Sequence, residues 1–95
     1  MSFYKVLVIR KQGNIHMFIN KTHDGRNNIC GLKIAELRIA MKISQRELAD
    51  RLQVAGLDID KNAIQRIECG KRFVTDIELL ALSRVLNCSL EELLL

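Results

Sequence analysis

The stretch SQRELADRLQVAGLDIDKNAIQRIECGKR, residues 44–72, contains two short apolar stripes separated by a polar connection. Within each stripe the apolar side chains are adjacent or three to four residues apart, which is the pattern of one face of an α-helix. They are Leu48, Ala49 and Leu52 in the first stripe and Ile64 and Ile67 in the second. Helices this short are marginal alone in water, so each must be held by packing against the other. The stretch therefore predicts two packed helices, with the small Ala49 side chain allowing a close crossing.

Capping signals locate the start of most helices in the chain. A Ser or Thr followed three residues later by Glu forms a capping box, in which both side chains bind backbone amides that the start of a helix leaves free. Such boxes begin at Ser44, Thr75 and Ser89. Asp60 is the expected N-cap of a helix over residues 61–69, and Gly70 is its expected left-handed stop.

A further helix is expected over residues 29–41, so the pattern predicts a mainly α fold, a bundle of five helices. The expected core side chains outside the two stripes are Leu32, Ile34, Leu37, Met41, Leu79, Leu82 and Leu86. In the last helix the apolar residues are Leu90, Leu93 and Leu94. These three are equally consistent with core packing and with a dimer seam.

The first part of the chain has a different pattern. The segment FYKVLVIRKQGNIHMFINK, residues 3–21, is rich in Val, Ile and aromatic residues around a Gly-Asn pair, which predicts a β-hairpin with strands over residues 4–10 and 15–20. Residues 21–28 are a polar linker with a turn at Asp24-Gly25. We therefore expect an N-terminal extension over residues 1–27 and a helical domain over residues 28–95.

Composition narrows the class of protein. The 95 residues suit one domain. The sequence contains no run of about eighteen apolar residues, so no membrane span is expected. The first 27 residues lack the combined features of a secretory signal, so a cytoplasmic location is expected. The cysteines, Cys30, Cys69 and Cys88, are widely spaced without a CxxC pair, which favours reduced thiols with neither a metal nor a disulfide.

Charge is unevenly distributed along the chain, whose formal net charge is +4. Residues 1–27 hold five cations and one acid, whereas residues 28–95 hold ten of each. Within that neutral part, residues 61–72 are mainly basic and residues 76–95 mainly acidic. Such a domain can orient itself on a polyanion although it carries no excess charge.

The polar face of the helix over residues 61–69 consists of Lys61, Asn62, Gln65 and Arg66. Asn and Gln pair with adenine and Arg and Lys with guanine, and a major groove about 12 Å wide admits one helix. Gln45, at the positive end of the preceding helix, suits a phosphate. Lys71 and Arg72, just after Gly70, are placed to hold the neighbouring backbone.

Three segments, SQRELADRL, IDKNAIQRIECGKR and ELLALSRVLNCSLEELL, with GLKIAELR before them, resemble the Cro and phage-repressor type of helix-turn-helix domain, the XRE family, over about residues 28–95. The resemblance implies a lambda-repressor-like bundle that binds double-stranded DNA. A homodimer is expected because one short helix reads too few base pairs. It places Gln45 and Arg46 near phosphate, and Lys61, Asn62, Gln65 and Arg66 at base-reading or groove-edge positions. It also implies a structural ion pair between Arg38 and Glu68.

One segment departs from the family pattern. The family usually joins the two helices by a tight turn, whereas QVAGLDID, residues 53–60, adds about five residues. We expect an extended first helix or a longer loop, with Leu57 and Ile59 filling the core. The change bears on the angle at which the reading helix meets the groove.

The expected function is sequence-specific binding of double-stranded DNA by a transcriptional regulator, a repressor that occupies an operator. The alternative is a protein-interaction module, such as an antitoxin or phage adaptor, that uses the N-terminal hairpin. The sequence has no paired carboxylates, no nucleophile with a base and no phosphate-binding glycine loop, which argues against an enzyme. No cofactor and no small-molecule ligand are expected.

Overall fold

The structure is a computed structural model in which residues 20–95 are described. These residues form five helices, α2 (Gly31–Ala40), α3 (Gln45–Val54), α4 (Lys61–Glu68), α5 (Asp76–Val85) and α6 (Leu90–Leu94). The mainly α helical bundle is therefore confirmed. The predicted hairpin, with strands over residues 4–10 and 15–20, lies outside the described residues apart from its last position.

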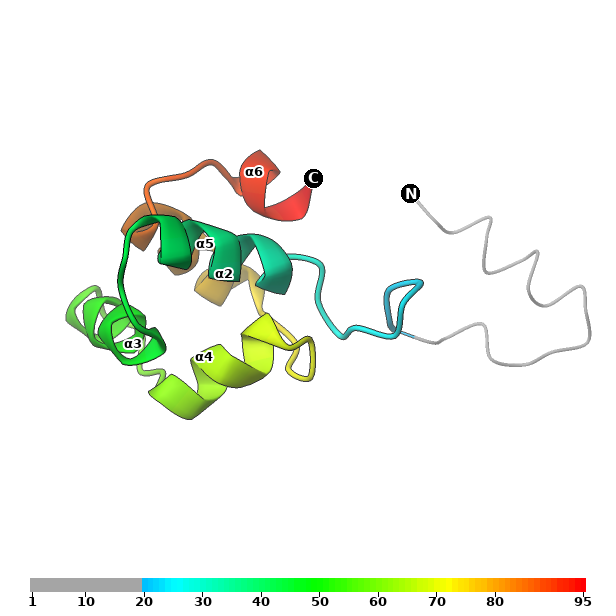
Figure 1. Cartoon of the computed structure of the whole chain (residues 1–95), viewed down its shortest axis with the longest axis horizontal. Coiled ribbons are helices and arrows are strands. Elements are labelled where there is room, and N and C mark those ends of the chain that lie inside the picture. Colours follow the sequence, from blue (N-terminus) through cyan, green and yellow to red (C-terminus); the bar gives the residue numbers. More distant parts are fainter. Residues whose placement is uncertain (1–19) are drawn as a thin grey trace, which may run out of the picture.

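The helices stack in three levels (Figure 1). Helices α2 and α5 occupy the middle, with α6 on one side and the α3 and α4 pair on the other. Contacts join α3 to α4 and α5, α2 to α4 and α6, and α5 to α6. Helix α4 therefore rests on α2 and α3 and lies at the surface of the bundle.

The predicted starts of four helices, α3 to α6, are confirmed. Ser44, Thr75 and Ser89 each accept a bond from the backbone amide three residues on, and the Glu at that position binds the cap residue's own amide. Asp60 caps α4 through Oδ1, which accepts the Ala63 amide at 2.8 Å. Helix α2 begins at Gly31, two residues later than predicted, because the buried Asn28 side chain accepts the Gly31 amide at 2.8 Å.

Four helices, α2 to α5, end in the same way. Each is followed by a residue in the left-handed region. The backbone amides of that residue and of the residue after it donate to carbonyls of the last helical turn, an arrangement called a Schellman motif. The left-handed residues are Lys42 (φ 61°), Gly56 (φ 99°), Gly70 (φ 82°) and Asn87 (φ 57°). Gly70 was the stop predicted from the sequence.

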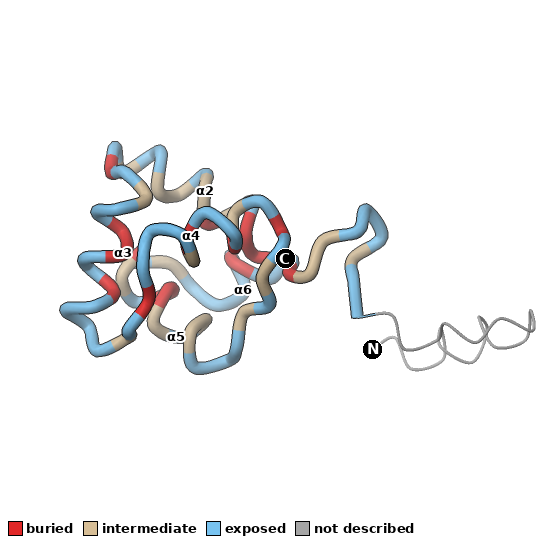
Figure 2. Tube along the Cα trace, turned by 90° about the horizontal axis from the view of Figure 1, so that it is seen from below, coloured by how far each residue is buried: buried red, intermediate tan, exposed pale blue. Residues whose placement is uncertain are grey.

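The core is a single cluster contributed by every helix of residues 20–95 and by the loops between them. Its fully buried side chains include Ile34, Leu48, Leu52, Ile64, Ile67, Leu82 and Leu93. Figure 2 shows the buried positions on the inward sides of the helices and the exposed ones along the outside. Leu37, Met41 and Leu79 pack against the cluster while partly exposed, and Leu86 is buried in it.

One core prediction is wrong, and the alternatives left open for the last helix divide between its leucines. Leu32 is 61% exposed, so its predicted core position is wrong. It lies two residues from the fully buried Ile34, which is about 200° around a helix, and both side chains cannot face one core. Leu90 and Leu94 are 43% and 39% exposed, whereas Leu93 between them is buried. The short α6 thus inserts one leucine and leaves two at the surface.

The connection between α3 and α4 takes both forms that were expected. Helix α3 extends to Val54, and residues 55–60 then form a loop. The Leu57 amide donates to the Leu52 carbonyl at 2.9 Å, and Gln53 Nε2 donates to the Ile59 carbonyl at 2.8 Å. Ile59 is buried and Leu57 packs against the core, so both fill it as predicted. The added residues form an ordered loop.

Candidate nucleic-acid interface

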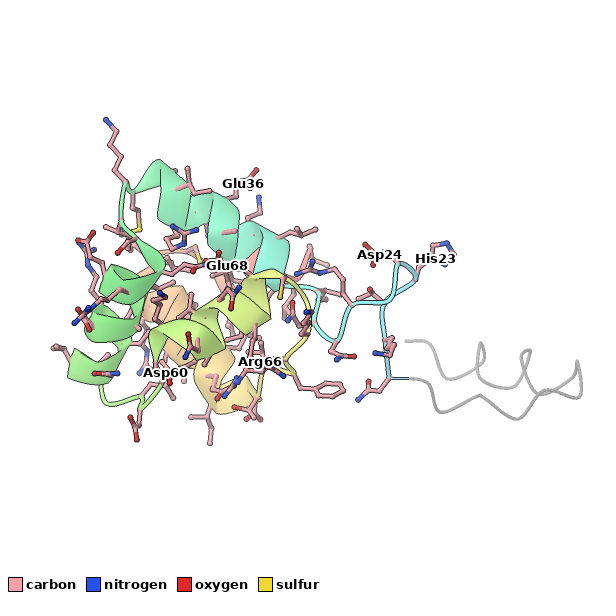
Figure 3. The ribbon with its side chains drawn as sticks, turned by 60° about the horizontal axis from the view of Figure 1, so that its bottom comes forward. His23, Asp24, Glu36, Asp60, Arg66 and Glu68 are labelled. Carbon is pink, nitrogen blue, oxygen red and sulfur yellow. The ribbon has the colours of Figure 1, made fainter. Side chains whose placement is uncertain are left out.

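The outer face of α4 is bare. Lys61, Asn62, Gln65 and Arg66 are all exposed. On the other side of the same helix Ile64 and Ile67 are fully buried. Figure 3 shows Arg66 pointing away from α2 and from the centre of the bundle. Amphipathicity alone explains this placement, since burying the two isoleucines turns the four long polar side chains outward.

A carboxylate on the opposite side of α4 joins three helices. Figure 3 shows Glu68 and Arg66 leaving opposite sides of the helix. Glu68 accepts bonds from Arg38 Nε at 2.7 Å and Nη2 at 3.0 Å, and from Gln45 Nε2 at 2.9 Å. Arg38 also donates through Nη1 to the Ile43 carbonyl at 2.9 Å. The ends of α2 and α4 and the start of α3 are therefore tied at one point, which makes α4 a rigid base for its outer side chains.

The start of α3 holds the first two predicted phosphate contacts. Gln45 is partly buried and its side-chain amide donates to Glu68, so this side chain braces α4. Arg46 is exposed. The first amides of a helix have no carbonyl partner within the helix and face outward with a partial positive charge. An anion beside Arg46 would meet both that charge and the guanidinium.

A groove of about 360 Å³ separates α3 from α4. Arg46, Lys61 and Asn62 line it together with two acids, Asp50 and Asp60. The acids limit how much negative charge the groove itself can accept. A polyanion would therefore meet cationic side chains at the edges of this groove and farther along α4.

The two basic residues after Gly70 have different surroundings. Lys71 is exposed. Arg72 is partly buried and donates through Nη1 and Nη2 to both carboxylate oxygens of Glu78, at 2.9 Å each, and to the Phe73 carbonyl. The bonds from Arg72 hold the pKa of Glu78 below its ordinary value of 4.5. The guanidinium of Arg72 is thus occupied within the chain.

Sequence reasoning missed three residues that bind the end of α4 and the loop after it. Arg26, Asn27 and Asn28 donate hydrogen bonds to carbonyls at the end of α4 and in the loop after it. Their acceptors are backbone atoms some forty residues away, which leave no side-chain pattern in the sequence. The one available signal was the pair of asparagines before a helix, a residue type that often binds backbone groups.

Other kinds of site find little support in residues 20–95. No three His, Cys, Asp or Glu side chains in this part gather as metal ligands would. Cys30, Cys69 and Cys88 are free thiols, and burial raises the pKa of Cys30 and Cys88. Among these residues no helix has the length and hydropathy needed to cross a bilayer.

Comparison with known proteins agrees with this geometry. No curated protein and no solved structure matches the chain. A family model described as helix-turn-helix matches residues 34–93, a range that begins in α2 and ends in α6 and includes the whole α3 and α4 pair. Because that match covers more than half of the chain, the protein belongs to the XRE-type helix-turn-helix family of DNA-binding, transcription-regulator domains.

Proposed function

We propose that the chain binds specific sequences in double-stranded DNA and acts as a repressor by occupying an operator. The observation that carries the proposal is the bare outer face of α4, where Lys61, Asn62, Gln65 and Arg66 project from a helix whose other face is buried. Those side chains offer the donors and acceptors that read base edges in a major groove. The protein acts by binding and performs no chemical step.

Specificity and affinity come from different side chains. The four residues on α4 read bases, because they lie along the face that would enter the groove. Arg46 and Lys71 neutralise phosphates on either side and supply affinity that is independent of sequence and falls with salt. Gln45 and Arg72, whose side chains bind Glu68 and Glu78, act mainly by holding the interface in shape.

A homodimer is part of the proposal, because one short helix reads few base pairs and two-fold pairing sets half-sites about one helical turn apart. An apolar surface suited to pairing lies where α2 meets α6. The exposed Ile29, Leu32 and Leu94 line a hollow of about 420 Å³ there, and the charged side chains of Lys33, Glu36 and Glu92 border it. This surface supports α6 and the neighbouring face of α2 as the dimer seam that we propose.

Selection from a pool of random duplexes tests the function. The full chain should enrich one sequence, and that duplex should bind at least about a thousandfold more tightly than random DNA at physiological salt. A double variant, Gln65→Ala with Arg66→Ala, should lose the enrichment and keep its helical circular dichroism. A wild-type chain that enriches no sequence contradicts the proposal.

The matched control removes similar side chains elsewhere on the surface. Gln53 binds the α3 to α4 loop and is unsuitable, so the control is Arg51→Ala with Arg84→Ala, two exposed residues outside the outer face of α4. This variant should enrich the same sequence as the wild type. Equal loss of selection in both double variants would mean that the α4 face has no special part in recognition.

A further inference from the structure

The end of α4 is bound by a segment that precedes the helix-turn-helix in sequence. We call residues 26–28 the clasp. Arg26 Nη2 donates to the Glu68 carbonyl at 2.8 Å and to that of Ile67 at 3.4 Å. Asn28 Nδ2 donates to the Ile67 carbonyl at 3.0 Å. These carbonyls belong to the last turn of α4, which has no further turn to bind them.

The clasp also binds the loop that follows α4. The Asn27 amide donates to the Gly70 carbonyl at 2.7 Å, and Asn27 Nδ2 donates to the Lys71 carbonyl at 3.0 Å. Asn28 Nδ2 donates to the Arg72 carbonyl at 2.8 Å. Of the six carbonyls from Ile67 to Arg72, five therefore accept a bond from the clasp.

Close packing leaves this contact little freedom. A Cβ added at Gly31 would come within 2.1 Å of the Ile67 carbonyl oxygen, so the first turn of α2 lies directly on the last turn of α4. A Cβ at Gly70, which has a positive φ, would come within 2.9 Å of the Arg26 side chain. Asn28 is buried, and its side chain both donates to α4 and accepts the Gly31 amide.

One of the proposed DNA contacts directly precedes the bound segment and another lies within it. Arg66 directly precedes the first bound carbonyl, and Lys71 lies within the loop. Lys61 and Asn62 are at the opposite end of α4, where the Asp60 cap and the α3 pairing hold the helix. A shift of the clasped end would therefore move Arg66 and Lys71 more than Lys61 and Asn62.

We infer that the clasp is a positioning element for DNA reading, which fixes the far end of α4 so that Arg66 meets its base pair and Lys71 its phosphate. The inference rests on the proposed DNA-binding function. It assigns Arg26, Asn27 and Asn28 a role in specificity although none of them needs to touch DNA. Their cation and amides hold the negative end of the helix dipole, where such groups are favoured.

Arg26→Met is the main test. Methionine keeps the aliphatic length that lies against Gly70 and removes the guanidinium, including Nε, which is buried without a hydrogen-bond partner among the described residues. The variant should therefore fold. Its affinity for the selected duplex should fall about tenfold, which is the effect of one misplaced base contact. Discrimination should be lost at the base pair whose discrimination Arg66→Ala also removes. Discrimination at the base pair identified by Asn62→Ala should stay.

Two variants control for charge and for rescue. Arg84→Met removes one exposed cation from α5, and Arg26→Met should lose no more affinity for random DNA than this control does. Arg26→Lys keeps a donor for the Glu68 carbonyl and should recover most of the discrimination. If Arg26→Met loses affinity equally for selected and random DNA, or loses no more affinity for the selected duplex than Arg84→Met does, the positioning role is overturned.

A second variant and a second readout keep the test independent of folding and of the proposed function. Should Arg26→Met unfold, Asn27→Ala removes the bond to the Lys71 carbonyl, together with the bond that Asn27 Oδ1 accepts from Lys21 Nζ, and should weaken the same base-pair discrimination. In the absence of DNA, Arg26→Met or Asn27→Ala should speed hydrogen exchange at the Cys69 and Lys71 amides, which bind carbonyls of α4. A wild type that prefers no duplex sinks the proposed function. Unchanged hydrogen exchange at the Cys69 and Lys71 amides in the folded variant contradicts the positioning role of the clasp.

Discussion

At the scale of single residues, Arg66 and Lys71 have different surroundings, which suit the different contacts with DNA that we propose for them. Arg66 projects from the last turn of α4, which the clasp holds, so its guanidinium has a fixed origin and can form a paired contact with one guanine. Lys71 lies in the loop after Gly70 and offers a flexible point charge. The first arrangement suits reading and the second suits affinity.

Replacing each by alanine should therefore give different signatures. Arg66→Ala should cost about 1–3 kcal/mol on the selected duplex and relax discrimination at one base pair. Lys71→Ala should weaken binding to selected and random DNA alike and lower the slope of log K against log salt by about one phosphate contact. Fluorescence titrations at several salt concentrations measure both quantities. Equal losses of Arg66→Ala on the two kinds of DNA would contradict its reading role.

The candidate site was partly accessible from single residues. The sequence pattern placed Lys61, Asn62, Gln65 and Arg66 on one polar face, because two buried isoleucines determine which way a short helix turns. The pattern gave no sign that Arg72 would bind Glu78 or that Gln45 would bind Glu68. Both choices depend on which side chains the packed helices bring together, and that information is absent from local spacing.

At the scale of elements, the helix starts were more predictable than the helix ends. A cap at the start uses a side-chain oxygen, so Ser44, Thr75 and Ser89 could be recognised by residue type. A cap at the end depends on a left-handed backbone conformation, and glycine is the residue type that most clearly indicates it in a sequence. Gly70 was recognised, whereas Lys42 and Asn87 adopt the same left-handed backbone without that signal.

The left-handed Lys42 gives a stability prediction. An L side chain in this conformation is strained by about 1 kcal/mol, and glycine is not. Lys42→Gly should therefore be more stable to urea than Lys42→Ala by about that amount, since both lose the same exposed charge and only glycine relieves the strain. Equal midpoints for the two variants would show that the end of α2 relaxes at no cost.

At the scale of the whole molecule, the ion pair between Arg72 and Glu78 links the loop after α4 to the start of α5. Because Arg72 lowers the pKa of Glu78, the pair stabilises the fold above the ordinary pKa of 4.5, and this stabilisation is lost as the pH falls through the lower folded value. Glu78→Gln keeps an oxygen for the Thr75 amide and removes the charge.

Glu78→Gln should thus be less stable than the wild type by about 1 kcal/mol at pH 7, with the difference shrinking as the pH falls below the ordinary pKa of 4.5. Urea unfolding at a series of pH values measures it. Glu91→Gln, at an exposed residue of α6 with no ion pair among the described residues, is the control and should show a smaller dependence. A Glu78→Gln difference that stays constant down to pH 3 would refute the linkage.

Self-association belongs to the same scale. Leu32, which the core does not use, faces the hollow between α2 and α6 that we propose as the dimer seam. Leu32→Lys should lower the mass measured by sedimentation equilibrium from dimer to monomer. Val54→Lys, at a residue 91% exposed at the end of α3, should leave the mass unchanged. A dimer that survives Leu32→Lys would move the seam elsewhere.

The loop over residues 55–60 separates chain length from helix placement. Two bonds to α3 hold the loop, from the Leu57 amide to the Leu52 carbonyl and from Gln53 to the Ile59 carbonyl, while Gly56, just before Leu57, has open space where a side chain would be. These two hydrogen bonds, which we call the anchors, therefore set the tilt of α4, and the number of residues in the loop is secondary. Related domains with shorter turns could reach the same tilt by a different route, so comparisons across the family should align the anchors before they count the loop.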